Sequence, residues 1–298
     1  MQSPIERLRL LFGRTLRSRV AGEDADEKAF HIWQVDGDRW HTPDDVIWHV
    51  NGDAAMYAGG IRSLLLQTLH PAAMAGVAGH SGYRSDPWGR LQRTSEFIAT
   101  TTYGPIPSAV ALIERVKAVH ERVRGKADDG TPYRASDPHL LEWVHITETQ
   151  SFLASFQHFG DRELSQAEAD AYVAQAAPVG ELLGAVDLAR TEADLLAAIE
   201  RFRPELRASP AARDTVEFLL RHPPIPWPAR PGYWMLAAGA IATLPVWARR
   251  ELGLPTSRWF DLLVGLPCGR LATAVVRWSL TPESRSGRWA RDEAAVPR

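Results

Sequence analysis

Apolar residues recur every three or four positions along most of the chain, which is the spacing of one face of an α-helix. Near the N-terminus, Ile5, Leu8, Phe12 and Leu16 form such a stripe, with five arginines around it. The sequence holds no tract of alternating or β-branched residues long enough to predict a sheet. The pattern therefore predicts an all-α fold.

Capping residues and prolines indicate where the helices begin and end. Aspartate followed by proline, as in Asp86-Pro87 and Asp137-Pro138, is typical of a helix start. We expect helices at about 53–69, 86–103, 108–124, 137–159, 165–183, 191–201, 209–222, 233–248 and 271–280. We also expect a loop at 126–135, a break at the proline run 223–231 and a frayed tail at 281–298.

The size and charge of the chain limit its class. With 298 residues, of which 45% are apolar, it is long enough to form a sizeable core, and we expect one domain over residues 1–298. The formal net charge of -2 offers no basic field for nucleic acid, which is excluded as a partner. A single cysteine, Cys268, excludes an intramolecular disulfide, a four-cysteine zinc site and a cysteine-held iron-sulfur cluster.

Two segments bear on the location of the protein. The arginine-rich N-terminal helix fits either a packed helix with a solvated face, which we favour, or peripheral contact with a membrane surface. It lacks the apolar core and cleavage site of a signal peptide, which favours a cytoplasmic location. The apolar segment 233–248 is shorter than the roughly 20 residues of a spanning helix, so we interpret it as a buried helix and expect no transmembrane span.

One predicted helix carries polar residues on a single face. Arg90, Arg93, Thr94 and Phe97 stand at positions i, i+3, i+4 and i+7, so their side chains share that face. Turned inward, the guanidinium groups suit an acidic ligand, because arginine binds carboxylates in a bidentate manner. An exposed, salt-bridged face is the other interpretation, and spacing alone favours it.

Two histidines lie at the edges of apolar helix faces. His120 follows Ile113 and Val116, and His145 follows Leu141, at helical spacing. Each could be a core histidine or an iron ligand in an apolar pocket, and the core role is the commoner one. Glu142 with His145 spells ExxH, a pair that di-iron helical bundles use twice but that occurs once here.

Several ordered motifs resemble a bacterial family that includes latex-clearing rubber oxygenases and MpaB-like oxygenases. The similarity covers about residues 48–255. The matching segments are 59–71 (GGIRSLLLQTLHP), 76–81 (GVAGHS), 86–94 (DPWGRLQRT), 120–125 (HERVRG), 133–138 (YRASDP) and 141–145 (LEWVH).

The resemblance implies a globin-like multi-helix bundle around a buried cofactor pocket. The cofactor would be a b-type haem, held by His120 and used with dioxygen to oxidise an apolar small molecule. Arg90 and Thr94 would line the haem and hold or polarise its distal or propionate side, with Arg93 beside them. The remaining candidate cofactor-binding residues, which match motif positions, are His70, His80 and His145. Such a haem would be non-covalent, because the chain has no CxxCH motif.

The sequence departs from the rubber-oxygenase branch. We find no counterpart of that branch's distal glutamate or of its iron-capping lysine, so cleavage of polyisoprene is not expected. Two alternatives remain open at this point. One is a haem or lipid carrier without turnover, and the other is a non-haem iron oxidoreductase built around Glu142 and His145.

Overall fold

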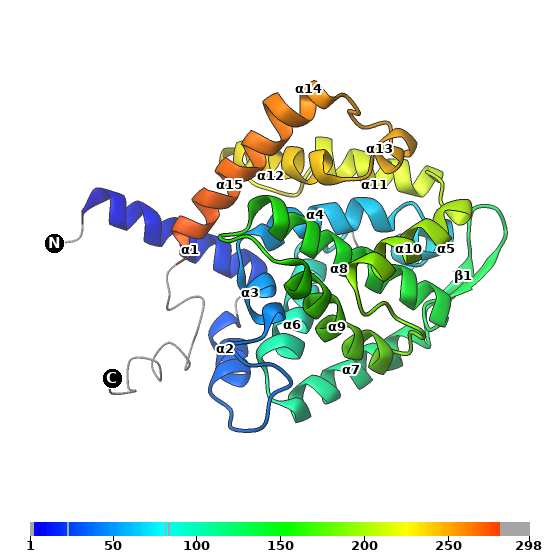
Figure 1. Ribbon diagram of the computed structural model, residues 1–298, viewed down its shortest axis with the longest axis horizontal. Coiled ribbons are helices and arrows are strands. Elements are labelled where there is room, and N and C mark those ends of the chain that lie inside the picture. The colour runs from blue at the N-terminus through cyan, green and yellow to red at the C-terminus, as the bar shows by residue number, and fades with distance from the viewer. Residues whose placement is uncertain (1–2, 23, 81, 83, 281–298) are drawn as a thin grey trace.

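The structure is a computed structural model that describes residues 3–22, 24–80, 82 and 84–280, and it is mostly helical (Figure 1). The helices from the N-terminus to the hairpin are α1 (Pro4–Ala21), α2 (Ala25–Trp33), α3 (Val46–Gly52), α4 (Ala55–Gln67), α5 (Pro71–His80), α6 (Pro87–Tyr103) and α7 (Ile106–His120). After the hairpin β1 (Arg124–Lys126) and β2 (Pro132–Arg134) follow α8 (Pro138–Phe159), α9 (Gln166–Leu183), α10 (Glu192–Phe202), the 3-10 turn η1 (Arg203–Glu205) and α11 (Pro210–Arg221). The C-terminal part holds the 3-10 turn η2 (Trp227–Ala229), α12 (Arg230–Thr243), α13 (Val246–Glu251), α14 (Arg258–Phe260), the π-helical turn η3 (Asp261–Gly265) and α15 (Leu266–Ser279).

The structure confirms the helix starts that Asp86-Pro87 and Asp137-Pro138 predicted. The Asp86 side chain accepts the backbone N–H of Gly89 at 2.9 Å at the start of α6. The Asp137 side chain does the same for His139 at the start of α8. In both helices the proline occupies the first turn, where no backbone donor is lost.

The predicted helix 108–124 is too long, and the predicted loop 126–135 is partly a strand. Helix α7 ends at His120, and Gly125 pairs with Tyr133 in a short antiparallel hairpin. Gly130 takes a φ of 84° in the connecting turn, a conformation that glycine adopts without steric cost. His120 is therefore the last residue of its helix.

The C-terminal helix also differs from the expectation. It begins at Arg258 rather than near residue 271 and continues through η3 to Ser279. The π-helical turn places Pro267 in the first turn of α15, so proline does not interrupt the helix. Within the described residues, Arg258–Ser279 is long and apolar enough to cross a membrane, judged by length and composition. The expected tail 281–298 lies outside the described residues.

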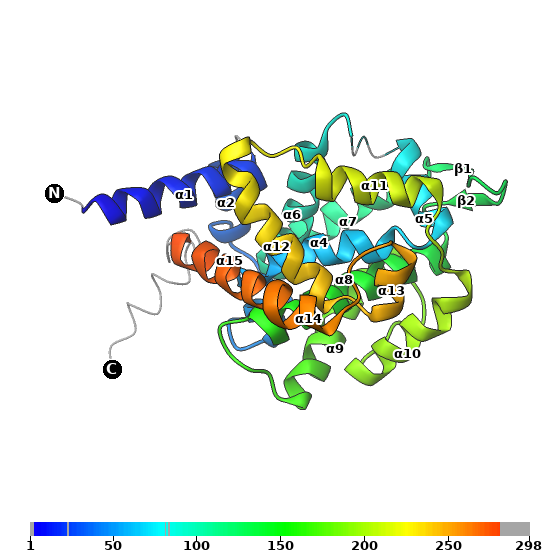
Figure 2. The same cartoon turned by 90° about the horizontal axis from the view of Figure 1, so that it is seen from above.

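The apolar segment 233–248 forms two helices instead of one. Pro245 ends α12 at Thr243 and precedes α13. Seen from above, α12 and α15 lie across α4 and α8 (Figure 2).

Helices α4 and α8 pack against each other through the centre of the core. Gly59 allows this close approach, because a Cβ at this position would lie 2.8 Å from the Phe152 ring. The buried guanidinium of Arg62 donates to Ser151 of α8 at 2.7 Å and to the Thr243 carbonyl of α12. This packing fixes the orientation of α8, which carries much of the candidate site.

A bidentate ion pair attaches the C-terminal helix to the same core. Arg277 of α15 donates to both carboxylate oxygens of Asp53, at 2.9 and 2.7 Å, and to the Phe159 carbonyl at 2.7 Å. Asp53 is buried at the junction of α3 and α4, and its carboxylate also accepts the N–H of Ala55. The hydrogen bonds that Arg277 donates to Asp53 raise the pKa of Arg277.

We expect Asp53→Ala to lower the free energy of unfolding by about 3 kcal/mol, because breaking a buried pair leaves the partner charge without compensation. Urea denaturation measures this loss. Adding Arg277→Met to Asp53→Ala should cost less than the two single changes summed. Asp26→Ala is the control: it breaks the exposed Arg17–Asp26 pair and should cost below about 1 kcal/mol. Equal losses of unfolding free energy in Asp53→Ala and Asp26→Ala would contradict the prediction.

Candidate active site

A cavity of about 120 Å³ lies between helices α3, α6, α7, α8 and α9. Its walls are mostly apolar, and two imidazoles and one carboxyl group reach it: His120, His145 and Glu148. Hydroxyl and amide groups complete one side, where Tyr172 donates to Asn51 and Asn51 donates to Thr102 at 2.9 Å. The cavity thus combines an apolar surface with a small number of polar groups that point into it.

One face of α8 supplies two of these groups. His145 and Glu148 follow Leu141 and precede Phe152 at helical spacing, so all four lie on the cavity side of the helix. Desolvation raises the pKa of Glu148 to about 7 and, with a contribution from Arg190, lowers the pKa of His145 to about 4. At neutral pH the imidazole is uncharged and the carboxyl can hold a proton.

His120 enters the cavity from the C-terminal end of α7. Burial lowers the pKa of its imidazole, which keeps the ring neutral. Its Nδ1 atom is buried and has no hydrogen-bond partner among the described residues. A neutral imidazole whose buried nitrogen has no partner in the described part of the chain can bind a metal ion or another group through that nitrogen.

Gly180 of α9 allows that helix to approach His145. A Cβ at this position would lie 2.7 Å from Nδ1 of His145 and 2.6 Å from Leu188. Nε2 of His145 lies 3.4 Å from the Thr149 hydroxyl. The imidazole is therefore confined between α8 and α9.

The predicted arginine stripe on α6 does not face the interior as one unit. Phe97 lines the large cavity, and Arg90 lines a second cavity of about 30 Å³. Arg93 and Thr94 are exposed, and Arg93 pairs with Asp86 at 3.2 Å. Residues at i+3 and i+4 lie to either side of the line joining i and i+7, so the packing of α6 can turn positions 90 and 97 inward and leave positions 93 and 94 exposed.

The two cavities share one wall residue. Val144 of α8 borders both of them, with His120 on the side of the larger cavity and Arg90 on the side of the smaller one. The structure thus brings His120 and His145 to one cavity and places Arg90 across Val144 from them.

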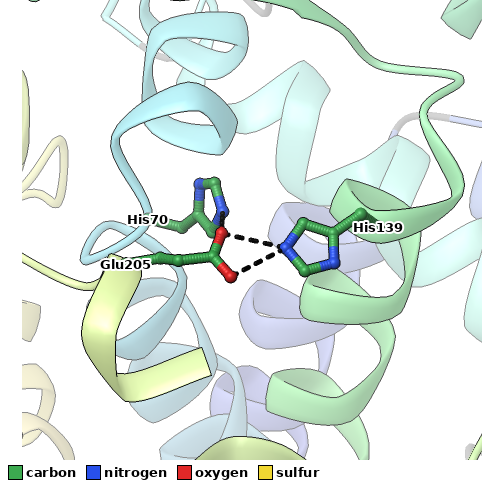
Figure 3. A group of neighbouring side chains, drawn as sticks. All are labelled: His70, His139 and Glu205. Carbon is green, nitrogen blue, oxygen red and sulfur yellow. Dashed lines mark hydrogen bonds and ion pairs between the residues drawn. The ribbon is translucent and has the colours of Figure 1, made fainter. Parts of the chain in front are cut away.

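His70 belongs to a separate group near the protein surface. His70, His139 and Glu205 come from three different elements and point toward one another (Figure 3). Their candidate ligand atoms lie within 4.8 Å of one another, so the group could hold a metal ion. Nε2 of His139 lies 2.9 Å from the Glu205 carboxylate, and Nε2 of buried His70 lies 3.4 Å from it.

The protonation of His70 opposes metal binding in the present geometry. Its Nδ1 accepts the backbone N–H of Ala73 at 3.4 Å, which places the ring proton of the neutral form on Nε2. Binding a metal through Nε2 requires that proton to leave. Burial lowers the pKa of His70, with Glu205 acting in the opposite direction.

The remaining candidates lie elsewhere. His80 is exposed at the end of α5, where its ring contacts Tyr133 edge-on. The Glu142 carboxylate accepts from Arg201 and does not line the cavity that holds His145. The ExxH pair therefore does not form a joint ligand set.

Sequence reasoning missed Glu148, His139, Glu205 and Gly180. Glu148 had a usable signal, because it is a carboxylate on the apolar face already defined by Leu141, His145 and Phe152. His139 and Glu205 meet across 66 positions of sequence, so no local pattern connects them.

The fold and the cavity define a mostly helical protein with imidazole and carboxyl groups in an apolar cavity. Residues 48–278 match the sequence model of the family described as ER-bound oxygenase mpaB/B'/rubber oxygenase, catalytic domain. The chain belongs to this family, and the match extends through most of α15. No curated protein and no solved structure matches the chain.

We expect Glu148→Gln to stabilise the protein more at pH 8 than at pH 5. A carboxyl whose pKa is raised on folding binds its proton more tightly in the folded state, so the stability of the parent protein falls as the pH rises toward and through about 7. Glutamine does not titrate, and the difference in unfolding free energy should therefore grow by about 2 to 3 kcal/mol over this range. Urea unfolding of the parent protein and of Glu148→Gln at pH 5 and pH 8 measures this difference.

Exposed Glu217→Gln on α11 is the matched control and should leave the pH dependence unchanged. His145 is common to the parent and to both variants, so its own titration cancels in the comparison. A pH-independent effect of Glu148→Gln would contradict the proposed protonation of Glu148.

Proposed function

We propose that this protein is a cytoplasmic, haem b-dependent oxygenase that oxidises an apolar small molecule with dioxygen. Membership of the oxygenase family supports an enzyme of this reaction class. The observation that carries the proposal is His120, a neutral imidazole with an unpaired buried nitrogen in an apolar cavity. A globin-like arrangement around one cofactor pocket in a single domain is part of the same proposal.

The donor set fits a haem. A neutral histidine is a common axial ligand to haem iron, and a guanidinium suits a propionate. The available volume is smaller than required, since pockets for drug-sized ligands enclose roughly 300–1,000 Å³ and the larger cavity encloses about 120 Å³. The two cavities, of about 120 and 30 Å³, together remain below this range even if Val144, which borders both, moves aside. Haem binding therefore requires the lining helices to separate as well as displacement of this side chain.

Bound haem would supply the activation of dioxygen. The chain's own residues would do the rest. His120 would hold the iron and Arg90 would pair with a propionate. The carboxyl of Glu148 would hold a proton and deliver it inside the cavity, because its pKa of about 7 lies near neutral pH. The apolar wall around Phe97 and Phe152 would exclude water and select an apolar substrate.

A non-haem iron oxygenase is the second candidate. Two histidines and one carboxylate with open positions form the usual ligand set of non-haem Fe(II) oxygenases, and His70, His139 and Glu205 provide these groups. This group replaces the pair Glu142 and His145 that the sequence suggested. None of its members lines the larger cavity, which favours the haem proposal.

Protein purified after growth with ample iron and haem precursor should show a Soret band, and His120→Ala should lose most of it because the iron loses its axial ligand. His80→Ala is the matched control, since His80 is exposed at the end of α5 and should leave the band unchanged. A colourless parent protein would contradict the proposal.

Oxygen consumption by the reduced protein with terpenoid or lipid substrates then separates an oxygenase from a haem or lipid carrier without turnover.

The second candidate predicts stoichiometric Fe(II) without porphyrin under anaerobic conditions, measured by metal analysis. His139→Ala should abolish this binding, because the carboxylate and one imidazole alone form an incomplete set. The exposed His31→Ala serves as the control. Iron found only together with porphyrin would exclude the non-haem function.

A further inference from the structure

The outer face of the C-terminal helix Arg258–Ser279 is apolar and exposed. Its exposed large apolar side chains are Trp259, Leu262, Leu263, Val264, Leu271, Val275 and Trp278. Trp259 is 73% exposed and Leu263 is 69% exposed. These residues recur at helical spacing and form one stripe, called here the C-terminal stripe, roughly 28 Å long at 1.5 Å per residue. Monomeric soluble proteins rarely expose contiguous apolar surface of this kind.

Two ion pairs and a close glycine contact fix the orientation of the helix, so that the C-terminal stripe faces away from the core. Arg277 binds Asp53 near one end of the helix, and Asp261 accepts from buried Arg249 at 2.6 and 3.1 Å near the other. Between them, Gly269 packs so closely on α12 that a Cβ there would lie 2.9 Å from the Cα of Gly239. The helix therefore cannot rotate its apolar face into the core without breaking both ion pairs.

Helix α1 extends the apolar surface and adds positive charge. It packs against α15 at the same end of the molecule (Figures 1 and 2). The large apolar side chains that it exposes are Ile5, Leu8, Leu11 and Phe12. Residues 4–21 contain five arginines and one glutamate.

We propose that the C-terminal stripe and α1 dock the protein in the plane of an anionic phospholipid bilayer. Tryptophans stand near both ends of the stripe, and this residue is enriched at the lipid–water interface. The arginines of α1 complement anionic headgroups. The inner face of α15 packs on α12 and α4, so the helix lies on the membrane and does not cross it.

Charge argues against a second copy of the chain as the occupant. A symmetric dimer would bury the same surface on both partners, so the arginines of α1 would have to find acidic partners within the C-terminal stripe helix and α1 of the other copy. The single acidic residue of α1, Glu6, already pairs with Arg9. The acidic residue of the C-terminal stripe helix, Asp261, is likewise paired with Arg249, whereas an anionic bilayer offers negative charge across its whole surface. The docking surface is independent of the chemistry proposed for the cavity.

The full-length protein should float with vesicles of phosphatidylcholine and phosphatidylglycerol in a density gradient. Binding should weaken with pure phosphatidylcholine and with rising salt, since anionic headgroups contribute. Leu263→Glu with Leu271→Glu should reduce the bound fraction about tenfold or more, because two apolar contacts are lost and like charge is added. Arg7→Glu with Arg14→Glu should abolish the preference for anionic lipid.

Leu196→Glu is the matched control. Leu196 is 46% exposed on α10, a helix that lies far from α1 (Figures 1 and 2), and the variant should float like the parent protein. All substituted residues are exposed, so unchanged circular dichroism and melting temperature should accompany every variant. Absence of the parent protein from the floated fraction would overturn the proposal, as would equal binding by every variant. A lipid-free dimer that Leu263→Glu with Leu271→Glu converts to a monomer, without vesicle binding by the parent, would assign the surface to a second copy.

Discussion

The buried guanidinium of Arg62 is the constraint on which the arrangement of this molecule depends. Burial lowers its pKa to about 9, and its hydrogen bonds go to the Ser151 hydroxyl of α8 and the Thr243 carbonyl at the end of α12. A buried cation is costly unless its donors are satisfied, so α4, α8 and α12 must meet at this point. Helix α8 is thereby oriented with His145 and Glu148 toward the cavity and His139 toward Glu205.

The cavity derives its chemistry from desolvation acting in opposite directions on two neighbouring groups. The same low-dielectric surroundings that favour a neutral imidazole at His145 favour a protonated carboxyl at Glu148. Within the part of the chain that the structure describes, neither group forms an ion pair that would reverse this preference. A site with two nearly uncharged polar groups among aromatic and aliphatic walls is compatible with an apolar substrate and would bind a charged one poorly.

The sequence predicted those features that depend on neighbours within one helical turn. Asp86-Pro87 and Asp137-Pro138 begin helices in the structure because a side chain caps the helix a few residues away. The C-terminal helix was predicted too short, because Pro267 has the pattern of a break unless a π-helical turn precedes it. The inward turn of Arg90 and the outward turn of Thr94 depend on the packing of α6, which periodicity does not specify.

The candidate site was predictable to the extent that it lies on one helix face. Glu148 could have been recognised beside His145, since both interrupt the same apolar stripe. His120 was identified from the family resemblance, and periodicity alone favoured a core role for it. The meeting of His70, His139 and Glu205 depends on how α5, α8 and η1 come together in space, and no spacing rule expresses that.

The π-helical turn Asp261–Gly265 controls which face of the C-terminal helix is exposed. A π-helical turn accommodates one residue more than an α-helical turn, and one residue corresponds to about 100° of rotation around the helix axis. The turn therefore sets the angular phase of everything that follows it. Loss of one residue there would swing Arg277 away from Asp53 and carry leucine and valine side chains toward the protein interior. A single insertion or deletion, rather than a set of substitutions, is enough to switch which face of α15 meets the solvent.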